Sequence, residues 1–356
     1  MLPTQLISPT VAALGASLLF GASIPFAKEL VGSISPVLLA GLLYAGSGIG
    51  LILTRLIKDR RWLRSGLQAE DWPWLIGAIG FGGILGPILL LLGLQQTGAA
   101  TASLLLNLES VLTALLAWLI FRESTSYRIV LGMLLIIAGG ILLSWPNSAK
   151  NTQSLFGSVV IAGACLCWAI DNNFTRKVSA GDSLFIAGIK GLISGIVNIS
   201  IAISLGMKLP SLMTINYALM VGFIGYGASL VLFVLALRGL GTARTGAYFS
   251  TAPFIGAAIA ILFFHETTSL SFWIATILMT MGVCLHLTEH HEHDHTHEPL
   301  SHEHSHIHDE HHQHSHDFPW NDKEPHSHYH HHNAMKHSHP HYPDIHHRHR
   351  HKKANK

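Results

Sequence analysis

The sequence predicts an all-α membrane protein of ten transmembrane helices, arranged as two inverted five-helix repeats and followed by a disordered tail. Three observations lead to this fold class. Apolar residues make up 49% of the chain, and Asp, Glu, Lys and Arg together only 12%, which lies outside the range of ordinary soluble domains. The apolar residues gather in long segments between residues 11 and 287, and the two halves of that region resemble each other. The last part of the chain is almost wholly polar.

Ten apolar segments have the length of a membrane-spanning helix, because a bilayer core about 30 Å thick needs about 20 helical residues. Short breaks rich in Pro, Gly, Asn or Asp separate them,. The first segment has no basic leader and no A-x-A-like cleavage site, so we predict a first span rather than a cleaved signal. The predicted spans are 9–27, 36–57, 73–95, 99–121, 128–145, 155–175, 184–205, 216–237, 242–264 and 270–287.

The orientation follows from the basic residues in the short connections, because Lys and Arg favour the cytoplasmic side. The connections after the even-numbered spans contain eleven basic residues, and the opposite connections contain three. Both termini are therefore predicted to be cytoplasmic, in the plasma (inner) membrane. The eleven are Arg55, Lys58, Arg60, Arg61, Arg64, Arg122, Arg128, Arg176, Lys177, Arg238 and Arg244, and the three are Lys28, Lys150 and Lys208.

An internal repeat appears when the chain is compared with itself. Gly77-x-x-Gly80-Phe81-Gly82 matches Gly222-x-x-Gly225-Tyr226-Gly227 in a later apolar span. Since each half has five helices, an odd number, the second half begins on the opposite side of the membrane. The predicted domains are repeats over 9–145 and 154–287 and a tail over 289–356. Further matches follow in the same order: Leu94 with Leu237, Gly98 with Gly241, Glu123 with Glu266, and Gly139 with Gly282.

Inverted repeats allow many secondary transporters to expose a central site alternately to each side of the membrane. The alternative is a duplicated structural bundle that transports nothing. Because the sequence contains no nucleotide-binding motif,, we expect movement to be driven by a gradient.

The spans also resemble a known family, the drug/metabolite transporter superfamily of the EamA type, from Val11 to Leu287. The resemblance depends on an ordered set of short motifs and implies a ten-helix permease for small metabolites or drugs, often an exporter. Family members often have a proline where this chain has Ser110 and an arginine where it has Leu43. The motifs are Phe20-Gly21-x4-Phe26-x-Lys28, Leu94-x3-Gly98-Ala99-Ala100-x-Ala102-Ser103, the span-closing Glu123 and Glu266, and Ala252-Pro253-Phe254.

Glu109 and Lys190 are ionisable residues that lie well inside predicted spans. Glu109 is near the middle of the fourth span, where an ionised side chain costs about 2.5 to 3.5 kcal/mol. We expect it to bind a proton or the solute; the alternative is a protonated carboxyl bonded to a neighbouring helix. Lys190 in the seventh span is its expected partner in charge. Lys190 could instead extend to the membrane surface, although the flanking glycines favour close helix packing.

Five more residues complete the candidate site. Asp171 lies one to two turns before Arg176 and Lys177, so it either contributes to the site or pairs with one of these cations. Asn172 and Asn173 fall at a position where we expect a kinked or unwound helix, which marks substrate sites in transporters. The remaining polar candidates are Asn107 and Tyr248.

The tail is dominated by histidine, which accounts for 25 of the 68 residues from Glu289 onward. Such a composition cannot bury a core. Clustered imidazoles beside acidic residues offer overlapping ligand sets for Zn, Ni, Co or Cu, and the interleaved pattern is unlike a contiguous cloning tag. The predicted ligands are His290, His291, His293, His295, His297, His302, His304, His306, His308, His311, His312, His314 and His316.

Together these patterns predict a secondary transporter of a small organic solute, with a metal-binding cytoplasmic tail. The alternatives are a divalent metal (Ni, Co or Zn) exporter and a membrane-anchored metal store or sensor. We expect no enzymatic activity, no required cofactor and no nucleic-acid partner. The expected partners are the solute, the lipid bilayer and divalent metal ions, and a homodimer is left open.

Overall fold

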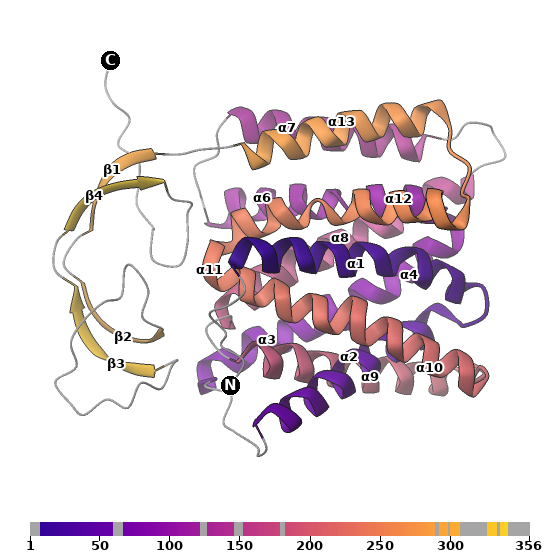
Figure 1. Cartoon of the computed structure of the whole chain (residues 1–356), viewed down its shortest axis with the longest axis horizontal. Helices are drawn as coiled ribbons and strands as arrows, with labels where there is room; N and C mark the ends of the chain where they lie inside the picture. The colour runs from indigo at the N-terminus through magenta and orange to yellow at the C-terminus, as the bar shows by residue number, and fades with distance from the viewer. Residues whose placement is uncertain are drawn as a thin grey trace.

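The computed structural model describes residues 8–59, 67–121, 127–145, 152–178, 182–288, 292–297, 300–306, 326–332 and 335–340. Helices lying roughly parallel or antiparallel to one another form the bulk of the molecule (Figure 1). The first half contains α1 (Pro9–Val31), α2 (Pro36–Asp59), η1 (Ala69–Asp71), α3 (Trp72–Ala78), η2 (Ile79–Leu85), α4 (Gly86–Gln96), α5 (Ala99–Leu105), α6 (Leu108–Phe121) and α7 (Tyr127–Ser144). The second half contains α8 (Thr152–Val178), α9 (Ser183–Ser204), α10 (Leu212–Val221), η3 (Gly222–Ala228), α11 (Ser229–Phe249), α12 (Ala252–Phe264) and α13 (Leu270–Leu287).

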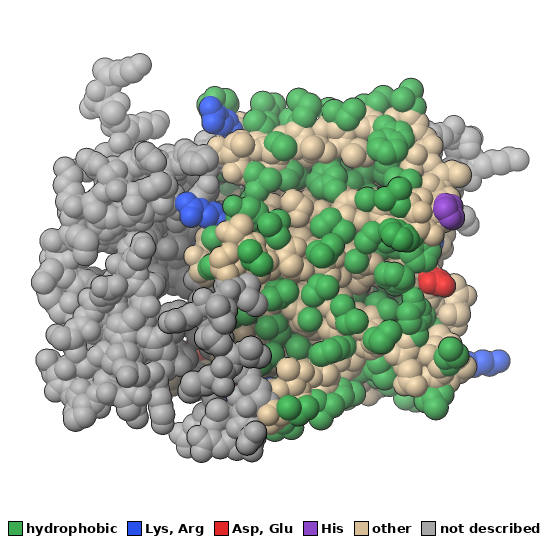
Figure 2. Space-filling view, viewed as in Figure 1, with side chains coloured by type: hydrophobic (Ala, Val, Ile, Leu, Met, Phe, Trp, Pro, Cys, Tyr) green, Lys and Arg blue, Asp and Glu red, His purple; other side chains and the backbone are tan. Residues whose placement is uncertain are grey.

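The prediction of ten spans is confirmed: ten helical stretches of the described chain are long and apolar enough to cross a membrane. Apolar side chains cover the visible face of the helical part, and charged side chains lie at its two ends (Figure 2). This distribution is the one that a hydrocarbon environment requires, because a charge facing lipid is costly. The chain is therefore a multi-pass membrane protein.

Spans three and eight each contain a π-helical segment. The third span runs α3, η2, α4, and the eighth runs α10, η3 and the first part of α11. Both π segments, Ile79–Leu85 and Gly222–Ala228, overlap the glycine motif that repeats in the sequence. A π-helix shifts hydrogen bonding from i→i+4 to i→i+5, and such segments are frequent at functional sites. The repeated motif therefore produces the same local distortion twice.

Spans four and nine are interrupted, in contrast to our prediction of a helix break near Asn172. The fourth span breaks between α5 and α6 at Leu106–Asn107, and the ninth between α11 and α12 at Ser250–Thr251. The helix around Asn172, α8, is continuous, and the Asn173 amide donates to the Ala169 carbonyl of the same helix at 2.8 Å. The sequence also predicted a break between 237 and 242, whereas α11 continues through these residues.

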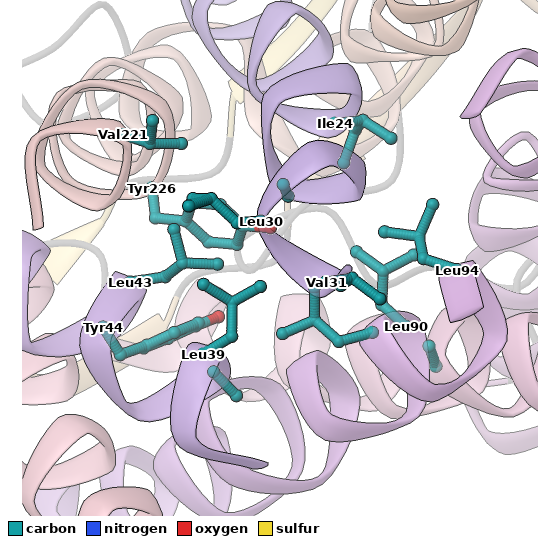
Figure 3. Packing of buried hydrophobic residues seen from close by; sticks show 14 of the residues in the cluster. Ile24, Leu30, Val31, Leu39, Leu43, Tyr44, Leu90, Leu94, Val221 and Tyr226 are labelled. Carbon is teal, nitrogen blue, oxygen red and sulfur yellow. The ribbon is translucent and has the colours of Figure 1, made fainter. Parts of the chain in front are cut away.

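The largest apolar core lies where α1, α2, α4, α5, α8, α10 and η3 meet. Its side chains include Ile24, Leu43, Leu90 and Tyr226, which point toward one another between the helices (Figure 3). Close packing of α2 on α9 adds to this core: a Cβ at Gly48 would lie 2.1 Å from the Leu192 nitrogen. Small residues that allow backbones to approach are typical of helix contacts in membranes. This contact positions Lys190, which is on α9.

The backbone of the tail contains four short strands, β1 (Glu292–His297), β2 (Leu300–His306), β3 (His326–His332) and β4 (Met335–Pro340). They pair antiparallel as β1 with β4 and β2 with β3. The sequence predicted no regular structure here. The strands differ from this prediction through backbone pairing, which can form without an apolar core. A two-stranded sheet is only marginally stable by itself.

Candidate functional site

Glu109 lies beside the break in the fourth span. After α5 ends at Leu105, the chain makes a tight turn in which the Asn107 N–H donates to the Leu104 carbonyl at 3.1 Å. Helix α6 then begins at Leu108, which places Glu109 in its first turn. The first turn of a helix carries partial positive charge from unpaired N–H groups, so it stabilises a carboxylate. The break therefore explains how a carboxyl group is accommodated in the middle of a span.

The Glu109 carboxylate bonds to the second half of the chain. The Asn172 amide on α8 donates to Glu109 Oε1 at 2.7 Å. Both side chains are only partly buried. The predicted pairing of Glu109 with Lys190 is wrong: within the described part of the chain, no cation lies within ion-pair distance of this carboxylate.

Lys190 instead pairs with Asp171. Its ammonium group donates to Asp171 Oδ1 at 2.6 Å and also to Oδ2. The Thr175 hydroxyl donates to Asp171 Oδ1 at 2.9 Å from one turn further along α8. Lys190 and Asp171 are both buried, so the alternative in which Lys190 extends to the membrane surface is wrong. Burial also explains the choice of partner, because each charge needs an opposite charge at close range where water is excluded.

The π segment in the third span packs directly against this ion pair. A Cβ at Gly82 would lie 1.9 Å from Asp171 Oδ2, so no larger residue fits there without displacement. The Gly82 carbonyl accepts hydrogen bonds from the Tyr44 hydroxyl at 2.7 Å and the Trp168 indole N–H at 3.0 Å. Gly82, Tyr44 and Trp168 are not among the site residues predicted from the sequence. The signal that could have indicated Gly82 was the glycine motif repeated in two spans.

The remaining candidates make no contact with these two pairs among the hydrogen bonds of the described residues; they bond within their own span or pack elsewhere. The Asn107 amide donates to the Leu104 carbonyl at 3.1 Å within the break, and its side-chain oxygen accepts no hydrogen bond from the described residues. Asn173 bonds to its own helix. Tyr248 packs with Ala12, Ala13 and Ala236 between α1 and α11. The structure thus joins Glu109 to Asn172 and Asp171 to Lys190 and leaves Tyr248 elsewhere.

The predicted metal ligands from His290 to His316 have side chains outside the described part of the chain, as does Glu123. Among the described residues, no group of three or more His, Cys, Asp or Glu side chains could hold a metal ion. The metal-binding role of the tail stays a prediction.

Comparison with known families gives one consistent result. A family model described as the EamA-like transporter family matches residues 8–145 and again residues 155–288. The chain is 30% identical over 284 residues to an uncharacterized transporter of Methanothermobacter thermautotrophicus, across 75% of this chain and 82% of that protein. It is 25% identical over 259 residues to the uncharacterized transporter YyaM of Bacillus subtilis, across 69% and 83% of the two chains.

Two further matches are partial or structural. The chain is 39% identical over 113 residues to a Pseudomonas aeruginosa protein named as the probable 4-amino-4-deoxy-L-arabinose-phosphoundecaprenol flippase subunit ArnE. This match covers 30% of this chain and 93% of that protein. One solved structure is similar to this chain, with a TM-score of 0.61 and 18% sequence identity. The match covers 79% of this chain and 98% of the chain in that structure. At that identity the likeness concerns the fold alone.

Proposed function

The chain belongs to the EamA-like transporter family, and from this premise we propose that it is a gradient-driven transporter that exports a small organic solute. Transport across a membrane follows from the family and from the relatives named as transporters. The solute class, the driving gradient and the direction are the proposed part.

One observation carries the proposal: Glu109 is a partly buried acidic residue in mid-span, and an amide from the other half of the chain holds its carboxyl group. An ionisable residue at this depth is costly, and such residues usually take part in substrate or proton pathways. The Asn172 hydrogen bond accounts for only one carboxylate oxygen. A proton or a polar group of the solute would satisfy the rest, so Glu109 is the proposed binding and coupling group.

Alternating access provides the proposed mechanism. Two similar five-helix halves support it, because the family model matches each half separately. The π segments in spans three and eight and the breaks in spans four and nine fall at corresponding positions. Discontinuous helices at the contact between inverted repeats form the central sites of many transporters. In this mechanism, exchange of conformations between the halves exposes Glu109 first to one side and then to the other.

We place the protein in the plasma membrane with both termini in the cytoplasm, on the basis of the basic residues in the connections. Fusion of a reporter that is active only in the cytoplasm to either end of the chain tests this orientation. Activity of both fusions is expected, and inactivity of both would reverse the proposed orientation.

The histidine tail favours a second candidate function, export of a divalent metal ion that the tail delivers. A third is a membrane-anchored metal store or sensor. Within the described spans, no group of three or more His, Cys, Asp or Glu side chains could hold a metal ion, and one Lys beside two acids suits a transition metal poorly. The first proposal is therefore preferred, with the tail as a metal-responsive addition.

The experiment compares Glu109→Gln with the wild-type chain. Growth of a deletion strain across toxic metabolites and metals, with the tail present or removed, identifies the solute. Proteoliposomes then measure uphill transport and exchange of that solute. Glu109→Gln should insert and fold, since it removes a charge, yet lose uphill transport while retaining exchange. Wild-type uphill transport by this variant would rule out the coupling role.

A further inference from the structure

We propose that Lys28 and Glu266 form an outer gate at the non-cytoplasmic end of the bundle, and that Arg176 and Glu123 form an equivalent cytoplasmic gate. This inference rests on the proposed function and orientation, and it adds the residues that close each side. The outer gate follows from contacts of the described residues, and the cytoplasmic gate follows from the sequence repeat.

Lys28 holds one side of the short connection Thr97-Gly98, which joins the third span to the fourth. It lies in the last turn of α1, and its ammonium group donates to the Leu94 carbonyl and, at 2.9 Å, to the Thr97 carbonyl. The last carbonyls of a helix lack partners within it and carry partial negative charge, so a cation stabilises them. Lys28 thereby ties α1 to the end of α4.

Glu266 holds the other side of the same connection. Its Oε2 accepts a hydrogen bond from the Ala100 N–H at the start of α5 at 3.0 Å, and its Oε1 packs against Gly98. The unpaired N–H groups at the start of a helix favour a carboxylate. Because Glu266 follows α12 in the second half and α5 belongs to the first half, this contact joins the two halves of the chain.

The backbone just before Glu266 has an uncommon conformation. His265 has a φ of 52°, in the left-handed region, and among the described residues it is the only one other than glycine with a positive φ. The Glu266 N–H donates to the Ala260 carbonyl at 3.2 Å, which closes α12 in a turn of the Schellman type. A left-handed residue other than glycine costs energy and is often found at functional sites. This turn ends α12 and lets Glu266 reach α5.

All of these contacts lie on one side of the membrane. Helices α1, α4 and α12 close the first, third and ninth spans, and odd-numbered spans end on the same side (Figure 1). With a cytoplasmic N-terminus, this is the outer side. The Phe26 ring on α1 also meets the Phe264 ring on α12, with centroids 5.5 Å apart. In this structure the two halves are thus held together at the outer end.

The repeat contains every part of this gate a second time. In each case the chemical type is kept, with one basic residue, one leucine, one glycine and one glutamate. The counterparts close the fourth, sixth and eighth spans or follow them, so they belong to the cytoplasmic side of an inverted repeat. The matched positions are Lys28 with Arg176, Leu94 with Leu237, Gly98 with Gly241, and Glu266 with Glu123. Glu123 is outside the described residues, so its gate is inferred from the repeat.

Two equivalent gates explain how the halves exchange conformations. When Glu266 leaves α5, the halves separate at the outer end, and Glu123 makes the corresponding contact at the cytoplasmic end. The same kind of charged contact is lost at one end and gained at the other. The two states therefore have similar free energies and are both populated, which a cycle of alternating access requires.

The test measures how quickly Cys165 reacts from each side of the membrane. Cys165 is fully buried on α8, and its thiol donates to the Leu105 carbonyl at 3.7 Å, at the break in the fourth span. A polar reagent must pass an open gate to reach it. Cys167 and Cys284 are replaced by alanine in every chain. A membrane-impermeant methanethiosulfonate is added to right-side-out vesicles to probe the outer side and to inverted vesicles to probe the cytoplasmic side.

Glu266→Ala should raise the rate of labelling from the outer side about fivefold, the effect of losing one helix cap on a two-state population, and lower the rate from the cytoplasmic side. Glu123→Ala should have the opposite effect, and the double variant should return toward the wild-type rates. Glu266→Gln should give a smaller shift in the same direction as Glu266→Ala. Lys208→Ala removes an exposed charge at the same end and is the matched control, with wild-type labelling expected.

Wild-type labelling of Glu266→Ala from both sides would overturn the proposal. Faster labelling from both sides at once would also overturn it, because a purely structural cap loosens the protein without favouring one side. Size-exclusion chromatography establishes the folding of each variant, and Glu266→Gln decides the question if Glu266→Ala aggregates. Opposite shifts in the two gate variants, with uphill transport retained in Glu109→Gln, would leave the gates and remove the proposed coupling role. Unchanged labelling, with uphill transport lost in Glu109→Gln, would remove the gates and leave the proposed function.

Discussion

Lys190 and Asp171 form a buried ion pair in which the ammonium group reaches both oxygens of the carboxylate. The two residues come from adjacent spans of the second half, α9 and α8. Their pairing leaves Glu109, on α6 of the first half, with an amide partner instead of a cation. A cation thus holds one acid, and a neutral amide holds the other.

The ion pair predicts a non-additive effect on stability. Asp171→Asn or Lys190→Met alone leaves one buried charge without compensation, which should destabilise the protein by about 3–5 kcal/mol. The double variant removes both charges and should recover most of the loss. Thermal unfolding of the three variants in detergent measures this coupling. Additive losses in the double variant would show that each residue acts through other contacts.

A second prediction concerns the contact that Glu266 makes with the first half of the chain. Glu266 Oε2 accepts a hydrogen bond from the Ala100 N–H at 3.0 Å, and a Cβ at Gly98 would lie 1.9 Å from Oε1. Gly98→Ala should displace the carboxylate and lower stability by about 1–2 kcal/mol, the usual effect of losing a helix cap. Glu266→Ala should cost a similar amount.

Because both substitutions remove the same contact, Gly98→Ala combined with Glu266→Ala should cost little more than either alone. Gly246→Ala is the matched control, since a Cβ there meets no atom within 4 Å and Ala is favoured over Gly inside a helix. A loss of stability in Gly246→Ala as large as that in Gly98→Ala would refute this account of the contact.

The histidine tail predicts metal binding that depends on pH. The full chain should bind several zinc or nickel ions at about pH 7.5 and release them below about pH 5.5, because imidazoles with a pKa near 6.5 become protonated and cannot act as ligands. A chain that ends at Thr288 should lose these sites. Calorimetric titration of both chains measures the difference. Tight binding of a single ion that persists at low pH would contradict a flexible set of overlapping ligands.

Removal of the tail distinguishes the two transport proposals. If the solute is organic, the chain without residues 289–356 should transport it at close to the wild-type rate and lose only the response to metal. Transport by proteoliposomes, with and without added zinc, measures both properties. Loss of all transport in the truncated chain, together with metal hypersensitivity of the cells, would favour the metal exporter.

The sequence alone determined the ten spans and the unusual depth of Glu109, because the length of an apolar run and the position of a charge within it are local properties. It also indicated positions that matter in both halves, through the repeated glycine motif. It did not determine that these glycines form π segments. Nor did it identify Tyr44 and Trp168, which lie far from Gly82 in the chain, as the donors to the Gly82 carbonyl.

The tertiary structure alone decided the partners of the charged groups and the places where the spans break. Lys190 has two acids within reach in principle, and charge cannot distinguish them. The close packing of α2 on α9 and the fit of Asp171 against Gly82 make that choice. The same holds for Asn172, which the sequence associated with a helix break and the structure places on an intact helix facing Glu109. Which side chains meet depends on how the helices are rotated and aligned, and only packing of the whole bundle determines that alignment.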